Sequence, residues 1–278
     1  MTTETLYPIR DVARLTGINP VTLRAWQRRY GLVEPQRTEK GHRLYSEQDI
    51  EQIRQILAWL ELGVSIGQVR QLLEAPGDAT PQTGDHWQPL LDKLDEALFA
   101  LSQRKLETQL AELTANYPLP LLRRQVLTPW LARLTLHLNR ADGQALHDFA
   151  VYWLEAFFSR RLIEQDKGKP LVLASWGRLP PLELLLDAIE ATQSGFTVTM
   201  LPTLTPREAK LLAPRFAGPL LVRVGAGLAS SDLGHEWPEG AVLLGELTRL
   251  YCDGKLAAPV QPSFSDWMRE AQDAAGLV

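Results

Sequence analysis

Apolar residues recur three and four positions apart through much of the first 165 residues, a spacing that predicts amphipathic helices. Four long runs of this kind lie at residues 87–101, 104–115, 119–138 and 143–165. Four consecutive helices with apolar faces are typical of a four-helix bundle. Phe149, Trp153 and Phe157 step by four along the last run, so we expect them in its core.

From Lys169 onward the pattern changes to short apolar runs separated by helical stretches. Strands are expected at PLVLAS, TVTML, PLLVRV and AVLLG, and helices at residues 182–192, 206–216 and 265–275. Strands that alternate with helices predict a parallel, doubly wound sheet of the Rossmann-like type. The turn at residues 225–227, which reads G-A-G, favours a tight loop over a phosphate site.

Ahead of the predicted bundle, residues 8–30 predict two short helices. Thr16-Gly17 ends the first helix. Asn19 followed by Pro20 is a strong start signal for the second, because Asn caps a helix N-terminus and Pro suits the first turn. Two short helices joined around a glycine predict a helix-turn-helix.

The second of these helices has two distinct faces. Positions at i, i+3 and i+7, which we expect in the core, hold Leu23, Trp26 and Tyr30. The opposite face holds Val21, Arg24, Ala25 and Arg28. Two guanidinium groups one turn apart can contact guanine edges or phosphates in a major groove. A solvated basic face is the alternative interpretation.

Residues 34–45 predict a hairpin directly after this helix. Its turn is expected at Lys40-Gly41, and its arms carry Arg37 and Arg43. A basic hairpin of this kind is typical of a DNA-contacting wing. Ser46 with Asp49 then resembles a capping box that opens the next helix.

Charge is unevenly distributed along the chain. Residues 6–45 hold eight basic and three acidic residues, so this head carries +5, whereas the whole chain carries −4 and the remainder therefore −9. A basic head on an acidic body can bind phosphates locally.

A single cysteine, Cys252, excludes an internal disulfide and a thiolate metal site. With neither a membrane-spanning run nor a signal-peptide layout, we expect a cytoplasmic protein without a membrane partner.

The motifs of the head, in their order, resemble the DNA-binding domain of the MerR family. The chain reads T-L-R-A-W at residues 22–26, G-L at 31–32, P-Q-R at 35–37 and R-L-Y at 43–45. Within the family, the runs NPVTLRAWQRRYGL and GHRLYS are most similar to the MlrA-like branch, regulators of curli and biofilm genes. The resemblance covers about a quarter of the chain.

This resemblance implies binding to double-stranded promoter DNA as a homodimer on a palindromic site, with distortion of over-long spacers and RNA polymerase as a partner. The residues expected at DNA are Thr22, Arg24, Ala25, Arg28, Arg37, Lys40, His42, Arg43 and Tyr45. Tyr45 has an equal alternative role, packing the wing onto the core. MerR proteins commonly continue into a long coiled coil, whereas residues 75–86 predict a linker with Pro and Gly, so dimerisation must arise elsewhere or on DNA.

The predicted order is a winged helix-turn-helix at 1–74, a linker at 75–86, a four-helix bundle at 87–167 and a Rossmann-like domain at 168–278. This mainly α chain with an α/β part resembles CarH-type light-sensing regulators, whose last two modules bind cobalamin. Their D-x-H-x-x-G motif would fall on residues 174–179, which read A-S-W-G-R-L and lack all three motif residues. The bundle's Glu-His pair is also absent near Val151-Tyr152. With Trp176 in the loop that a corrin would fill, we expect the fold without the cofactor and without a metal.

The favoured function is therefore a DNA-binding regulator whose body responds to another protein. The branch resemblance makes a cyclic-di-GMP-related signalling protein the leading partner. The alternative is a regulator that senses cobalamin, another tetrapyrrole or a small ligand. A corrinoid- or nucleotide-dependent enzyme would need a nucleophile–base pair, paired carboxylates or a metal-ligand cluster, and the sequence offers none, so we expect no enzyme.

Overall fold

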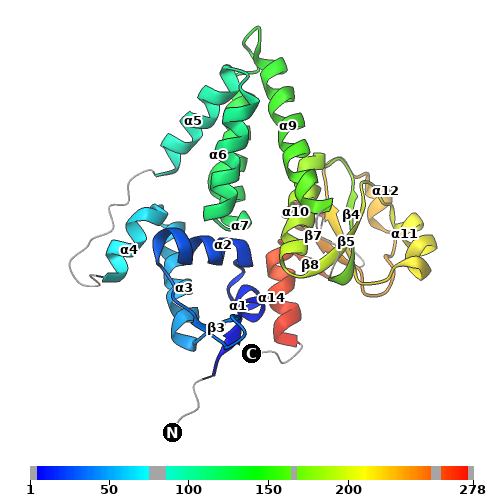
Figure 1. Cartoon of the computed structure of the whole chain (residues 1–278). Coiled ribbons are helices and arrows are strands. Elements are labelled where there is room, and N and C mark those ends of the chain that lie inside the picture. Colours follow the sequence, from blue (N-terminus) through cyan, green and yellow to red (C-terminus); the bar gives the residue numbers. More distant parts are fainter. Residues whose placement is uncertain (1–4, 75–85, 164–167, 252–257, 275–278) are drawn as a thin grey trace. The chain divides into compact units, whose positions relative to one another are not determined.

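The computed structural model describes residues 5–74, 86–163, 168–251 and 258–274, and Figure 1 labels its elements. The chain forms two compact units, Met1–Ala150 and Val151–Val278. It is mainly helical with one α/β part, which confirms the predicted fold class. Most of the expected linker, residues 75–85, and Cys252 lie outside the described residues. Within the described helices, none combines the length and apolar character needed to cross a membrane.

The first unit opens with a winged helix-turn-helix. Its elements are β1 (Tyr7–Pro8), α1 (Ile9–Thr16), α2 (Pro20–Ala25), the π-helical turn η1 (Trp26–Tyr30), β2 (Gln36–Arg37), β3 (Arg43–Tyr45), α3 (Glu47–Glu61) and α4 (Ile66–Glu74). The predicted cap is confirmed, because the Asn19 side-chain oxygen accepts a 2.8 Å hydrogen bond from the Thr22 backbone N–H. We call α2 with η1 the recognition helix.

The wing is a three-stranded antiparallel sheet in the order β1-β3-β2. Its turn is centred on Glu39 and Lys40, one residue earlier than the sequence predicts. The Gly41 N–H donates to the Thr38 carbonyl at 2.8 Å, and Gly41 itself follows the turn with a φ of +79°. Glycine adopts this left-handed conformation without a Cβ penalty, which explains why it stands after the turn rather than in it.

A set of packed helices follows in the same unit: α5 (Trp87–Phe99), α6 (Gln103–Asn116), α7 (Leu119–Leu122), η2 (Arg123–Leu127) and α8 (Thr128–Leu136). A buried polar contact links α8 to α5, because the Trp130 indole donates to the Asp95 carboxylate at 2.8 Å. Arg133 lies 2.6 Å from the same carboxylate. The fourth helical run, α9 (Gly143–Ile163), begins in the first unit and continues into the second. Along it, Trp153 and Phe157 are buried, as expected, and Phe149 is half-buried.

The second unit contains a five-stranded parallel sheet in the order β5-β4-β6-β7-β8, which confirms the doubly wound prediction. Its strands are β4 (Lys169–Trp176), β5 (Phe196–Leu201), β6 (Leu220–Val224), β7 (Val242–Leu244) and β8 (Val260–Gln261). Its helices are α10 (Pro181–Gln193), α11 (Pro206–Leu212), the 3-10 turn η3 (Ala213–Arg215), α12 (Ser230–Leu233), α13 (Leu247–Tyr251) and α14 (Phe264–Ala274).

Both faces of this sheet are covered by helices. Successive side chains of β4 point to opposite faces, and on each face they are buried. Leu171 and Leu173 belong to a buried cluster with residues of α10 and α14. Val172, Ala174 and Trp176 belong to a second cluster, which includes residues of α11 and α12. This arrangement accounts for the continuous apolar run of the strand.

Candidate nucleic-acid interface

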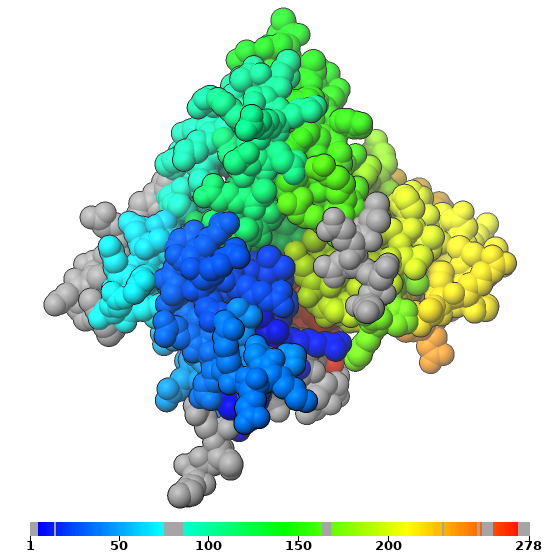
Figure 2. All heavy atoms as spheres, in the orientation of Figure 1, coloured from blue at the N-terminus to red at the C-terminus, as the bar shows by residue number. Residues whose placement is uncertain are grey.

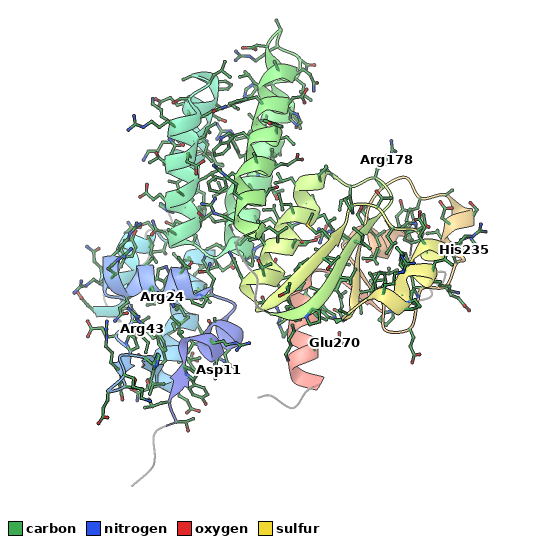
Figure 3. All side chains as sticks on the ribbon, turned by 45° about the vertical axis from the view of Figure 1, so that its right-hand side comes forward. Asp11, Arg24, Arg43, Arg178, His235 and Glu270 are labelled. Carbon is green, nitrogen blue, oxygen red and sulfur yellow. The ribbon has the colours of Figure 1, made fainter. Side chains whose placement is uncertain are left out.

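The recognition helix presents two arginines to solvent. Arg24 and Arg28 are exposed and lie one turn apart, while Leu23 and Trp26 on the other side are buried. Figure 3 labels Arg24 on this helix, and the blue atoms of Figure 2 show the helix-turn-helix at the surface of the first unit. This arrangement leaves both guanidinium groups free to approach an anionic partner.

Three of the residues that the sequence places at DNA are buried: Thr22, Ala25 and Tyr45. The prediction that Ala25 lies on the outward face is wrong, since it is only 4% exposed. Helix α6 packs along α2, in addition to the elements of the head that do so. More of the surface of the recognition helix is therefore covered than the head alone would cover. Burial also raises the pKa of the Tyr45 phenol.

The wing carries the remaining cations. Arg37, Lys40 and His42 are exposed, whereas Arg43 is half-buried. Arg37 faces Arg43 across the β2–β3 pair, and like charges in that position repel one another unless an anion lies between or beside them. A phosphate would relieve this repulsion.

A contact that the sequence did not reveal ties the wing to the recognition helix. The Arg43 Nε donates a 2.7 Å hydrogen bond to the Gln27 side-chain oxygen. Gln27 therefore fixes the position of one wing cation relative to the helix that carries Arg24 and Arg28. No local sequence pattern signals such a pair, because it depends on how the hairpin folds back.

A second unforeseen contact joins the recognition helix to α6. The Trp26 indole donates to the Asn116 backbone carbonyl at 2.7 Å, and Arg29 donates to the Asn116 side-chain oxygen at 3.2 Å. Arg124 of η2 pairs in addition with Glu61 of α3. The recognition helix is thus held, on the side of Trp26, by a helix some ninety positions away in the sequence.

The carboxyl edge of the parallel sheet is the place where doubly wound folds bind ligands, at the point where strand order reverses. Here that point lies between β4 and β6. The loops that follow these two strands are joined by backbone hydrogen bonds: Arg178 and Ala226 exchange two, of 2.8 and 2.9 Å, and the Gly225 N–H donates to the Trp176 carbonyl at 2.7 Å. The loop N–H groups at 225 and 226 are therefore already used.

Comparison with known proteins gives a consistent result. Residues 7–76 match the family described as MerR HTH family regulatory protein. The HTH-type transcriptional regulators MlrA of Salmonella typhimurium and of Escherichia coli are each 34% identical to this chain over 203 residues, 70% of this chain and 79% of theirs. The chain belongs to the MerR family. It is a DNA-binding transcription regulator similar to MlrA.

The HTH-type transcriptional repressor CarH of Myxococcus xanthus is also similar, with 30% identity over 237 residues, 77% of this chain and 78% of that protein. The CarH-type resemblance raises the question of whether this MerR-family chain could hold cobalamin. The residues present do not fit that cofactor. Trp176, expected in the loop, instead ends β4 and is buried edge-to-face against Trp237 with ring centroids 5.3 Å apart. No histidine stands at the motif positions, and the crevice between the two loops is bridged.

Proposed function

We propose that this MerR-family regulator binds palindromic promoter DNA as a homodimer, with the recognition helix in the major groove. The observation that carries the proposal is the pair of exposed arginines, Arg24 and Arg28, on a helix whose other side is buried. Guanidinium groups in this position can donate two hydrogen bonds to a guanine edge or hold a phosphate. A head of +5 on an otherwise acidic chain supports attraction of this one region to DNA.

The wing would then contact the phosphate backbone beside the groove through Arg37, Lys40, His42 and Arg43. Contacts of this kind set the position of the protein, whereas base contacts set its specificity. The buried residues Thr22, Ala25 and Tyr45 would support the interface from beneath instead of contacting DNA. We propose further that distortion of the bound promoter spacer makes it accessible to RNA polymerase, in the cytoplasm, without any catalytic step by this chain.

Selection of bound duplexes from a random DNA pool by the purified full chain tests this function. We expect an enriched inverted repeat whose half-sites lie about 10 base pairs, or a multiple of that, apart. Mass measurement of the complex should give two chains per duplex. Enrichment of a single unrepeated site bound by one chain would contradict the homodimer, and the absence of any enrichment would contradict sequence-specific binding.

We propose that the signal comes from another protein, which binds the chain after the linker at residues 75–86. This part of the chain consists, in our proposal, of a helical bundle at 87–167 and a Rossmann-like domain at 168–278. The lost motif residues at 174–179 and the bridged loops at the carboxyl edge support this, because they argue against a cofactor there. A cyclic-di-GMP-related signalling protein is the leading candidate, since the resembling branch implies such partners.

A chimera tests the proposed signal input. Residues after Asp85 are replaced by an unrelated dimerisation domain, which restores two-fold association. Because the swap also removes Asn116, which holds Trp26 and Arg29, DNA binding by the chimera is measured first. We expect the chimera to bind the selected DNA but to ignore the native signal in cells. If it still responds, the replaced region senses nothing and acts only as a scaffold. The alternative of a tetrapyrrole sensor is tested by visible absorbance of the purified full chain and by calorimetry with adenosylcobalamin. Micromolar or tighter binding of adenosylcobalamin would support that alternative.

A further inference from the structure

The recognition helix carries an exposed apolar side chain beside its arginines. Val21, the second residue of α2, is 60% exposed, whereas Leu23, two positions later, is 1% exposed. Val21 precedes Arg24 and Arg28 by three and seven positions, a spacing that places all three on one face of the helix, and all three are exposed. Figure 3 labels Arg24 on this face. The face therefore combines two positive charges with one branched apolar group at its N-terminal end.

Packing inside the protein does not account for this side chain. In residues 5–74, which the structure describes, Val21 and Leu62 are the large apolar residues that are exposed. A single exposed apolar residue is common on protein surfaces, but Val21 lies in the first turn of the recognition helix, where a helix-turn-helix contacts base edges. Its branched side chain has one strongly preferred rotamer in a helix, so holding it against a partner costs little conformational entropy.

The chemistry of the major groove offers one group that suits this side chain. Base edges there present hydrogen-bond donors and acceptors, which a side chain without polar atoms cannot satisfy. Thymine differs, because its C5-methyl group is apolar and projects into the groove. Phosphate oxygens accept hydrogen bonds from cationic and polar groups, so they gain nothing from Val21. Contact between its methyl groups and that of a thymine would instead remove apolar surface from water, which is favourable.

We propose that Val21 contacts the methyl group of a thymine in each half-site of the promoter and thereby determines specificity at that base pair. This inference rests on the proposed placement of the recognition helix in the major groove. Three residues of an α-helix rise about 4.5 Å, and neighbouring base pairs lie about 3.4 Å apart. The thymine therefore lies within about two base pairs of the base whose recognition depends on Arg24. The two side chains recognise neighbouring bases by different means, a methyl group and a hydrogen-bonding edge.

Deoxyuridine tests the contact, because it lacks the C5-methyl group of thymidine and keeps the same hydrogen-bonding groups. Thymines of the selected duplex are replaced by deoxyuridine, one symmetric pair at a time, and binding of the full chain is measured by fluorescence anisotropy. At one position we expect an affinity loss of about three- to fivefold for each half-site, the effect of one buried methyl group. Equal affinity for all of the substituted duplexes would overturn the proposal. A selected half-site without a thymine within two base pairs of the Arg24-dependent base would overturn it as well.

Two variants show whether Val21 is the residue that contacts this methyl group. Val21→Ala removes both methyl groups of the side chain at an exposed helical position, where alanine is the better helix former. This variant should bind the thymine and deoxyuridine duplexes equally well. Leu62→Ala truncates a side chain of similar exposure, 61%, at the end of α3, and should keep the full difference between the two duplexes. A difference that persists in Val21→Ala would mean that another residue contacts the methyl group, and the proposal would be wrong.

These outcomes differ from a failure of the proposed function itself. If no duplex is enriched from the random pool, sequence-specific binding fails and the Val21 contact fails with it. If a duplex is enriched and its dependence on the thymine methyl group is the same for wild type and Val21→Ala, only the Val21 contact is refuted.

Discussion

The indole nitrogen of Trp26 donates a 2.7 Å hydrogen bond to the backbone carbonyl of Asn116. Both residues are buried, Trp26 completely. The same indole fills the core of the helix-turn-helix, so one side chain packs the DNA-binding head and attaches it to α6. A change at this residue therefore affects both the stability of the head and its connection to the following helices.

Replacing this indole should lower the free energy of unfolding by more than the loss of ring volume alone would. In Trp26→Phe the Asn116 carbonyl loses its donor, and a buried unpaired acceptor costs about 1–3 kcal/mol. Urea unfolding of the full chain should show this loss beyond that of Trp153→Phe, which removes the same ring volume from α9 and breaks no hydrogen bond among the described residues. Equal losses in the two variants would mean that the Trp26–Asn116 bond contributes nothing.

Arg24→Ala should weaken binding to the selected DNA by about 1–3 kcal/mol and relax specificity at one base position. The reason is the loss of an exposed guanidinium that enters the major groove in the proposed complex. Arg104→Ala, which removes an exposed positive charge from α6, controls for net charge and should change neither quantity. Fluorescence anisotropy with matched and single-mismatch duplexes measures both. Wild-type binding by Arg24→Ala would mean that the recognition helix is oriented differently.

Arg43→Ala should weaken binding to all sequences about equally and lower the salt slope by roughly 1, because a phosphate contact carries no base information. This arginine is also held by Gln27. Gln27→Ala keeps the charge but frees the side chain, so it should leave the salt slope unchanged while affinity falls. Titrations at several salt concentrations separate the two effects, and a flattened slope in Gln27→Ala would argue against this division of roles.

Stability should depend on pH through His86. Burial lowers the pKa of this imidazole below its ordinary value of about 6.5. Below that value the unfolded chain binds a proton more readily than the native chain, so the free energy of unfolding should fall as the pH drops from 7.5 through 6.5. His86→Gln should remove this part of the pH dependence, whereas His42→Gln at the exposed wing tip should retain it. Parallel curves for wild type and His86→Gln would refute the linkage.

Local signals predicted the elements of this chain well. Asn19 and Pro20 start α2 as expected, the Ser46–Asp49 capping box opens α3, and four of the five parallel strands lie at the apolar runs that predict them. The missed strand β8 and the missed strand β1 have two residues each, too few for a periodic pattern. Their pairing is set by the neighbouring strand rather than by their own composition.

The candidate site was predicted less completely, because burial depends on distant segments. Helical spacing separated Leu23 and Trp26 from Arg24 and Arg28 correctly. It could not show that α6 packs along α2, or that Ala25 is buried. The bonds from Gln27 to Arg43 and from Trp26 to Asn116 likewise join residues 16 and 90 positions apart. Neither spacing carries a recognisable sequence pattern.

The bridged loops after β4 and β6 limit what a single substitution can do at this edge of the sheet. A histidine at position 176 would not by itself make a site for cobalt. Trp176 now packs against Trp237, and residues 176–178 share three backbone hydrogen bonds with residues 225–226. Backbone hydrogen bonds do not depend on the side chain at one position, so one substitution does not remove them. One substitution at position 176 therefore leaves the bridge between the two loops in place, so a different ligand chemistry at this edge of the sheet needs changes in both loops.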